Sequence, residues 1–105
     1  MKLYISQPMR GRSKEEIQKE RMSIIGHVAE DHLPKGEELI VIDNFFQEGY
    51  TSPLMYLGKS IETMAQADTA FFAKGWEEAR GCRIENAVAL EYGLTVIEDY
   101  RKEQQ

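Results

Sequence analysis

Apolar residues occur along this chain in two patterns, as short β-rich runs and as longer stretches with helical spacing. The short runs predict four strands, at residues 2–6, 38–43, 69–73 and 94–98. The longer stretches predict three helices, at residues 14–31, about 54–66 and 82–92. Because strands and helices alternate in so short a chain, we expect one parallel sheet with helices on both faces.

Capping residues lie where the apolar pattern places the ends of the helices. Ser13 and Glu16 have the capping-box spacing at the start of the first helix, where each side chain satisfies a free backbone N–H. Gly93 follows the last helix, at a position where a left-handed residue commonly ends the helical backbone. No repeat or low-complexity linker divides the chain, so residues 1–105 are expected to form a single domain.

Composition limits the classes of partner and the cellular setting. The 18 acidic residues outnumber the 13 Lys and Arg, and the net charge of −5 argues against binding to a nucleic-acid polymer. One cysteine makes no internal disulfide, and the start of the chain lacks the apolar run of a signal peptide or membrane helix. We therefore expect a cytoplasmic protein without a membrane partner. His27 and His32 fall away from the strand ends and Cys82 has no close histidine, so no metal site is expected.

Ligands of parallel sheets bind at the carboxyl ends of the strands, which makes three loops candidate site segments. These loops span residues 6–13, 43–53 and 74–82. In the first loop, Arg10, Gly11 and Arg12 directly precede a helix start, where free N–H groups and guanidinium forks favour an anion. The alternative is a solvated loop whose arginines face water. The motif is neither a P-loop nor a dinucleotide-binding fingerprint.

Aromatic residues distinguish the second and third loops from plain connectors. Asp43 ends the second predicted strand and is followed by three aromatic residues, Phe45, Phe46 and Tyr50. Such a combination either holds and stacks a flat base or forms a turn with core or dimer contacts, and the residues alone favour the turn. In the third loop, Trp76 is a candidate pocket wall, although packing is the commoner role of a tryptophan.

Two acids near the strand ends are candidate catalytic groups. Asp68 directly precedes the third strand, where an acid is usually a cap or turn residue. Glu85 lies in the first turn of the last helix, where the helix dipole alone favours an acid. Helical spacing places Glu85 on one face with Ala89 and Tyr92, directed toward the strand ends. The core face of this helix is then expected to consist of Ile84, Ala87 and Val88.

Two motifs carry a resemblance that spans almost the whole chain. The stretches "YISQPMRGRS" and "GWEEARGCRIENAVALEYGLTVI" are similar to a family of small phage and bacterial proteins of uncharacterised function. Those proteins in turn resemble the nucleoside 2-deoxyribosyltransferase superfamily, which includes deoxynucleoside 5′-monophosphate N-glycosidases. The resemblance implies a flavodoxin-like, three-layer α/β sandwich with a parallel sheet of four or five strands.

The same resemblance implies a catalytic role for Glu85. In the superfamily, a Gly-x-x-x-Glu-x-x-x-Ala motif supplies the nucleophile that attacks the deoxyribose C1′, and Gly81, Glu85 and Ala89 match it. Tyr4 corresponds to a tyrosine near that nucleophile, and residues 10–13 correspond to the loop that holds the 5′-phosphate. The candidate substrate contacts are Ser6, Arg10, Gly11, Arg12, Ser13, Asp43, Phe45, Trp76 and Gly81.

Two positions depart from the pattern of these families. An Asp eight positions before the acid of the Ala-Asp dipeptide is replaced here by Ser60, and a Gly after Tyr-Ile-Ser is replaced by Gln7. Both departures bear on turnover more than on ligand binding. Members of the superfamily also complete their sites with a residue from a neighbouring subunit, which implies a homo-oligomer.

The resulting hypothesis is an enzyme that cleaves or transfers the N-glycosidic bond of a 2′-deoxynucleotide, with hydrolysis favoured over transfer. No metal or organic cofactor is expected, and the setting implied by the resemblance is the cytosol of a bacterium or a phage-infected host. The alternative is a non-catalytic nucleotide-binding protein, such as a sponge or sensor of phage origin. A third hypothesis is a small interaction module with a vestigial pocket.

Overall fold

Strands and helices alternate in the computed structural model of the protein, which describes residues 1–44 and 52–102. The elements are β1 (Lys2–Ser6), α1 (Lys14–Asp31), β2 (Ile40–Val41), α2 (Pro53–Met64), β3 (Thr69–Phe72), the 3-10 helix η1 (Trp76–Glu78), α3 (Arg80–Glu91) and β4 (Thr95–Glu98). The described strands form one sheet in the order β2-β1-β3-β4, and every neighbouring pair is parallel.

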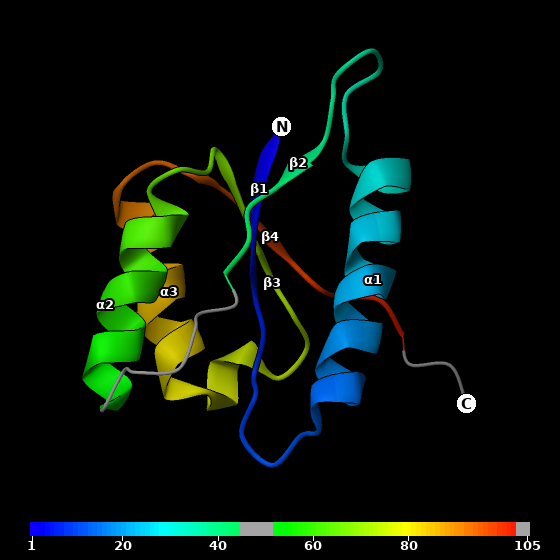
Figure 1. Cartoon of the computed structure of the whole chain (residues 1–105). Helices are drawn as coiled ribbons and strands as arrows, with labels where there is room; N and C mark the ends of the chain where they lie inside the picture. Colours follow the sequence, from blue (N-terminus) through cyan, green and yellow to red (C-terminus); the bar gives the residue numbers. More distant parts are fainter. Residues whose placement is uncertain (45–51, 103–105) are drawn as a thin grey trace.

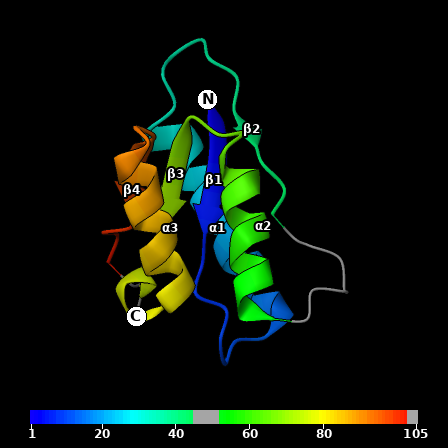
Figure 2. The ribbon, with the colours of Figure 1, turned by 90° about the vertical axis from the view of Figure 1, so that its left-hand side faces the viewer.

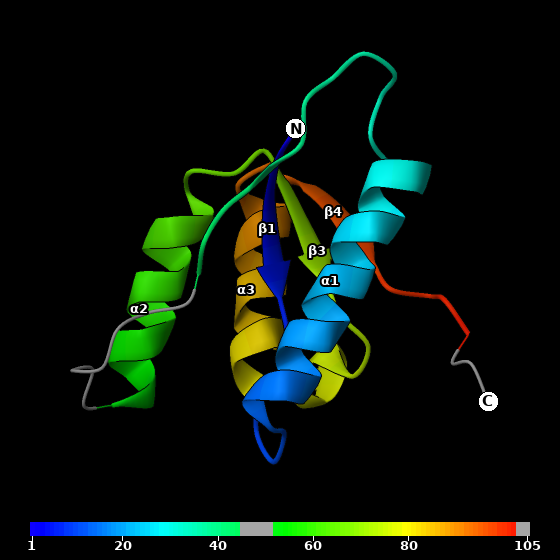
Figure 3. The same cartoon turned by 45° about the vertical axis from the view of Figure 1, so that its right-hand side comes forward.

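The helices form two layers around this sheet. Helix α1 covers one face, and α2 and α3 cover the other (Figure 1). Viewed from that second side, α2 and α3 lie in front of the sheet (Figure 2). A view turned the other way brings α1 forward on the opposite face (Figure 3). The predicted three-layer α/β fold is therefore confirmed, and the strand order is the one found in flavodoxin-like sheets.

The central strands β1 and β3 are covered on both faces, so their sequences are almost continuously apolar. Alternate strand residues point to opposite faces and divide the core in two. The cluster on the α1 side consists of Leu3, Ile5, Ile24, Val28, Phe71 and Ala73. The cluster under α2 and α3 consists of Tyr4, Met64, Ala70, Phe72 and Ala89. The polar hydroxyl of Tyr4 is therefore carried into the second cluster by a core strand.

Strand β2 is shorter than the predicted run of residues 38–43. Only Ile40 and Val41 are paired with β1 as a strand, at the edge of the sheet. Beyond them the backbone N–H of Ile42 still donates to Leu3 O at 2.8 Å. At Asn44 a side-chain hydrogen bond takes the place of the backbone hydrogen bonds to β1, because Nδ2 donates to the carbonyl of Ile5 at 2.8 Å. A side-chain hydrogen bond thus ends a strand that the apolar run alone would extend.

The expected core face of α3 is wrong in two of its three residues. Ile84 is 38 % exposed and Ala87 is exposed, whereas Val88 is partly buried against the second core cluster. Tyr92, expected beside Glu85, is 81 % exposed. The buried residues of α3 are Cys82, Glu85, Asn86 and Ala89. Small side chains on this face let the helix lie close to the sheet, so the acid itself is on the buried side.

Local capping signals are confirmed at both ends of the chain. The Ser13 hydroxyl accepts a hydrogen bond from the Glu16 N–H at 3.1 Å and caps α1. Gly93 has φ +79° and ends α3 in the left-handed conformation. Within residues 1–44 and 52–102, the helices are all too short or too polar to cross a membrane.

Candidate active site

The strand order switches direction between β1 and β3, because β2 lies on one side of β1 whereas β3 and β4 lie on the other. This switch point is at the carboxyl ends of β1 and β3. The loops that follow both strands, together with the first turns of α1 and α3, lie at this end of the sheet (Figure 1). Ligands of doubly wound sheets bind in the crevice that such a switch creates. Two cavities are found here, and Gln7, Met9 and Glu85 line both of them.

The larger of these two cavities has a volume of about 640 Å³ and lies between the β1–α1 loop and the start of α3. The smaller one has a volume of about 330 Å³ and opens toward α2, where Asn44, Tyr56 and Ser60 line it. Both volumes are in the range of small-molecule sites. Because Glu85 lines both cavities, its carboxyl group is accessible to a ligand that occupies either one.

A buried acid and a tyrosine form the centre of the site. The Tyr4 hydroxyl donates to Glu85 Oε1 at 2.6 Å, and the two residues are 1 % and 7 % exposed. Burial raises the pKa of Glu85, and the nearby hydroxyl groups of Tyr4 and Ser6 oppose this rise. Burial, followed by the charge of Glu85, raises the pKa of Tyr4 far above its usual value, so the phenol remains a donor.

Ser6 and Gly81 flank this pair. Ser6 Oγ is buried without a hydrogen-bond partner of good geometry among the described residues, yet it lies close enough to lower the pKa of Glu85. A methyl group added at Gly81 would lie 3.9 Å from Glu85 Oε2, which is an ordinary contact. The glycine therefore leaves space above the carboxyl group instead of relieving a clash. Ser6 lines the smaller cavity and Gly81 lines the larger one.

The four candidate phosphate-binding residues of the β1–α1 loop are not directed to one place. Arg10 lines the larger cavity together with Glu85. Gly11 has φ +75°, which allows the tight turn between the two arginines. Arg12 is directed to the other side of the loop, where its NH1 donates to Pro8 O and to Glu20 Oε1. Ser13 caps α1, so Arg10 alone of the four lines the cavity of Glu85.

Gln7 links β1 to α1. Its side chain is buried, and Nε2 donates to Ile17 O at 3.0 Å and to Glu20 Oε1 at 2.9 Å. The amide thus fixes the start of the β1–α1 loop and forms part of the wall of both cavities.

The remaining sequence-predicted contacts have separate positions. Trp76 packs against Phe72, with ring centroids 5.7 Å apart, and belongs to the margin of the second core cluster. Asp43 is exposed, and its charge acts on Arg21. Phe45, like Phe46 and Tyr50, lies outside the described residues. Asp68 has the structural role predicted for it, because its carboxylate accepts hydrogen bonds from Lys2 N and Thr69 Oγ1.

Sequence reasoning missed Arg21, a buried cation behind the site. It is 7 % exposed, and its guanidinium donates to Asn44 Oδ1 at 2.9 Å and to Ile42 O at 3.1 Å. Burial lowers the pKa of Arg21, and the charge of Asp43 opposes this effect. The sequence contained one signal for a buried Arg21, which is its position on the apolar face of α1 between Ile17 and Ile24. A charged residue on such a face requires partners.

A partly desolvated carboxyl group at the junction of two cavities can act as a nucleophile or as a general base. The Tyr4 hydroxyl occupies Oε1, which leaves Oε2 as the oxygen available to a reacting atom. In the described part of the chain, no three His, Cys, Asp or Glu side chains are grouped so that they could hold a metal ion.

Comparison with known proteins assigns the chain to a family. Residues 1–98 match a domain of unknown function, DUF4406. No curated protein and no solved structure matches the chain. Because the match spans β1 to β4 and every residue of the Tyr4–Glu85 site, the protein belongs to the DUF4406 family.

Proposed function

We propose that the protein hydrolyses the N-glycosidic bond of a 2′-deoxynucleotide, with Glu85 as the nucleophile. The observation that carries this proposal is the buried Tyr4–Glu85 pair, 2.6 Å between the Tyr4 hydroxyl and Oε1, at the junction of the two cavities. The resemblance to the nucleoside 2-deoxyribosyltransferase superfamily supports it, because the Gly81, Glu85 and Ala89 positions match the nucleophile motif.

The proposed reaction has two steps. Oε2 of the ionised Glu85 attacks C1′, the bond from C1′ to the base nitrogen breaks, and the departing base takes a proton from water. The hydroxide left by that water then attacks C1′ of the glycosyl ester and releases the Glu85 carboxylate. The net change is one nucleotide and one water converted to free base and deoxyribose 5-phosphate.

The cavities favour a particular placement of the substrate. Arg10 lines the larger cavity and would hold the 5′-phosphate there, with the sugar above Glu85. The base would enter the smaller cavity, between Asn44 and Tyr56, where amide and aromatic side chains suit a flat heterocycle. Tyr4 would hold the carboxylate in place, and its hydrogen bond opposes the rise in the Glu85 pKa that burial causes.

The test is release of free base from each of the four deoxynucleoside 5′-monophosphates, followed by chromatography. We expect wild-type protein to release at least one base and Glu85→Gln to lose about 100-fold or more in rate. Glu91→Gln is the matched control, because Glu91 is an exposed acid on the same helix. The proposal fails if folded wild-type protein releases no base, or if Glu85→Gln and Glu91→Gln have equal rates.

A second candidate function is nucleotide binding without turnover, and Ser60 favours it. The smaller cavity has a serine where the superfamily carries an acid that assists the reaction. In a thermal-shift series, a nucleotide that raises the melting temperature but yields no base would support this function. Arg10→Gln should reduce that shift, since Arg10 lines the cavity proposed for the phosphate.

We also propose that the protein is a homo-oligomer, as the superfamily resemblance implies. Leu54 on α2 is 75 % exposed and Ile84 on α3 is 38 % exposed, and the two line one groove beside the site. An apolar groove of this kind suits a contact with a second copy of the chain. Sedimentation velocity of wild type and Leu54→Glu tests this, and a wild-type monomer at all concentrations would contradict it.

A further inference from the structure

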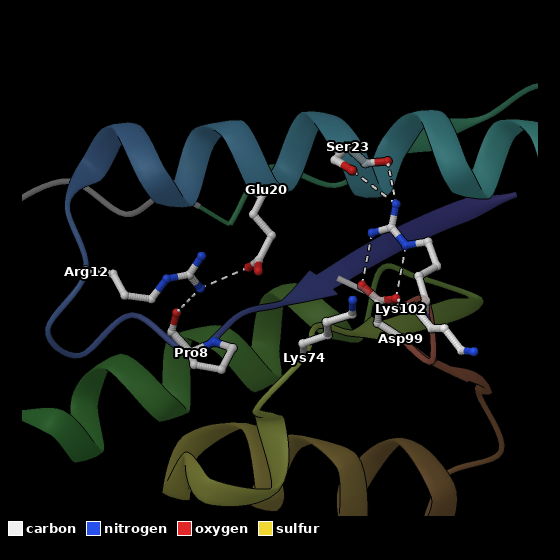
Figure 4. A pocket seen from close by; sticks show the side chains of 8 residues that line it. Pro8, Arg12, Glu20, Ser23, Lys74, Asp99 and Lys102 are labelled. Carbon is white, nitrogen blue, oxygen red and sulfur yellow. Dashed lines mark hydrogen bonds and ion pairs between the residues drawn. The ribbon is translucent and has the colours of Figure 1, made fainter. Parts of the chain in front are cut away.

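A third cavity lies on the α1 side of the sheet, and Figure 4 shows the side chains that line it. Glu85 is not among them. The cavity volume is about 710 Å³, the largest of the three described so far. The residues that line it are Pro8, Arg12, Glu20, Ser23, Lys74, Asp99, Arg101 and Lys102. Of these, only Pro8 also lines the larger Glu85 cavity. Four basic and two acidic side chains therefore surround a space that the proposed reaction does not use.

The first acid, Asp99, is already neutralised within the structure. Arg101 donates from Nε to Asp99 Oδ1 at 3.0 Å and from NH2 to Oδ2 at 2.9 Å, which is a two-pronged ion pair. Burial alone would raise the pKa of Asp99, but the hydrogen bonds and charge of Arg101, with a smaller effect of Lys74, lower it. Arg101 also donates to Ser23 Oγ at 3.0 Å, so this pair fastens the segment after β4 to α1.

The second acid, Glu20, is likewise occupied. Its Oε1 accepts from Arg12 NH1 and from Gln7 Nε2, each at 2.9 Å. Arg12 uses the same NH1 for Pro8 O at 2.8 Å. Within residues 1–44 and 52–102, Nε and NH2 of Arg12 make no hydrogen bond. One edge of this guanidinium is therefore available to a further acceptor.

The two lysines of the cavity have no ion pair with any described residue. Lys74 follows β3 and is half-buried, and Figure 4 shows its side chain extending between Glu20 and Asp99. Arg12 and Lys102 lie on opposite sides of it in the same view. Because both acids are paired with arginines, the lysines give the cavity a net charge of +2 in a protein whose total charge is −5.

We propose that this cavity binds a phosphate group, with Lys74 as the central contact and Arg12 and Lys102 on either side. An ammonium group and a free guanidinium edge are the donors that phosphate oxygens accept most strongly. The partial burial of Lys74 reduces solvent screening of its charge, which strengthens its attraction for an anion. The volume exceeds that of phosphate alone and accommodates a phosphate carried on a small organic molecule.

Calorimetric titration at constant ionic strength tests this site, with inorganic phosphate in one arm and ribose 5-phosphate in the other. Wild-type protein is expected to bind phosphate saturably against a chloride background, and Lys74→Gln to weaken binding at least tenfold. Lys102→Gln should weaken it by a smaller factor, because Lys102 is exposed. Tighter binding of ribose 5-phosphate than of inorganic phosphate identifies an organic phosphate as the ligand, and equal binding identifies the free ion.

Two control variants separate this site from its alternatives. Lys35→Gln removes an exposed lysine of the α1–β2 turn and should leave phosphate binding unchanged. Arg10→Gln alters the Glu85 cavity and removes only binding at that cavity, so it should keep the component of phosphate binding that Lys74→Gln weakens. The proposal is overturned if wild-type protein shows no saturable binding, or if Arg10→Gln abolishes binding that Lys74→Gln retains. Circular dichroism of each variant confirms that loss of binding is not loss of fold.

Discussion

The substitution Tyr4→Phe isolates the hydrogen bond on which the candidate site depends. It removes one oxygen atom, the donor to Glu85 Oε1 at 2.6 Å, and keeps the ring that packs in the core under α2 and α3. Both side chains are almost fully buried, so water does not readily replace the lost donor. The hydrogen bond lowers the pKa of Glu85, and its loss should therefore raise that pKa further.

The size of the effect follows from the nature of this bond. A hydrogen bond to a charged group contributes about 1.5–3 kcal/mol, and about 1.4 kcal/mol corresponds to a tenfold change in an equilibrium constant. The ionisation constant of Glu85 should thus fall by roughly 10- to 150-fold in Tyr4→Phe. In unfolding experiments the variant should lose more stability at a pH where Glu85 is ionised than at a pH where it is protonated.

The direct measurement is the NMR titration of the Glu85 side-chain carboxyl carbon in wild type and in Tyr4→Phe. Tyr92→Phe serves as the control, because that hydroxyl belongs to a residue that is 81 % exposed and lies at the other end of α3. We expect the titration midpoint of Glu85 in Tyr92→Phe to equal that in the wild type. A Glu85 midpoint in Tyr4→Phe that equals or lies below the wild-type midpoint would refute the reasoning.

Further predictions concern Glu85, Cys82 and two glycines. Burial raises the pKa of Glu85, so the free energy of unfolding of the wild type should fall as pH rises from the ordinary carboxyl pKa through the raised value. In urea unfolding, Glu85→Gln should lack that fall. Parallel curves of unfolding free energy against pH for the two proteins would contradict the prediction. Burial raises the pKa of the Cys82 thiol to about 11, so a thiol reagent at pH 8 should label the folded protein slowly and the urea-unfolded protein fast; equal rates would contradict this. Gly93→Ala, at φ +79°, should lower the free energy of unfolding by about 1 kcal/mol. Gly26→Ala, in the open middle of α1, should raise the free energy of unfolding by about 0.5–1 kcal/mol. A change of the same sign in both variants would refute the backbone argument.

Local signals in the sequence were sufficient for the first strand and the first helix. The strand at residues 2–6 and the helix at 14–31 have the predicted bounds, because Ser13 satisfies a free N–H of the helix within its own turn. Predicted ends of the later helices are off by one or two residues, at Pro53–Met64 and Arg80–Glu91. Caps and turns depend on neighbours in the chain, so they can be predicted from sequence.

Strand pairing and helix orientation were not predictable in this way. The length of β2 depends on a hydrogen bond between Asn44 and Ile5, which are 39 positions apart. The direction of Glu85 depends on which face of α3 lies against the sheet, and Ile84 misled the prediction because its size suggested the core. The two loop arginines likewise diverge, since Glu20 on α1 holds Arg12 on the far side.

The sequence by itself determined the alternation of strands and helices, the capping of α1 and α3, and the identity of Glu85 as the acid to examine. The tertiary structure decided that Glu85 meets Tyr4, that Arg10 alone of the loop residues 10–13 lines its cavity, and that Arg21 lies buried behind it. Hydrophobic periodicity depends on local geometry and is written into each segment. Contacts between residues such as Tyr4 and Glu85, 81 positions apart, exist only after the sheet and helices have packed, because packing sets which side chains share a desolvated space.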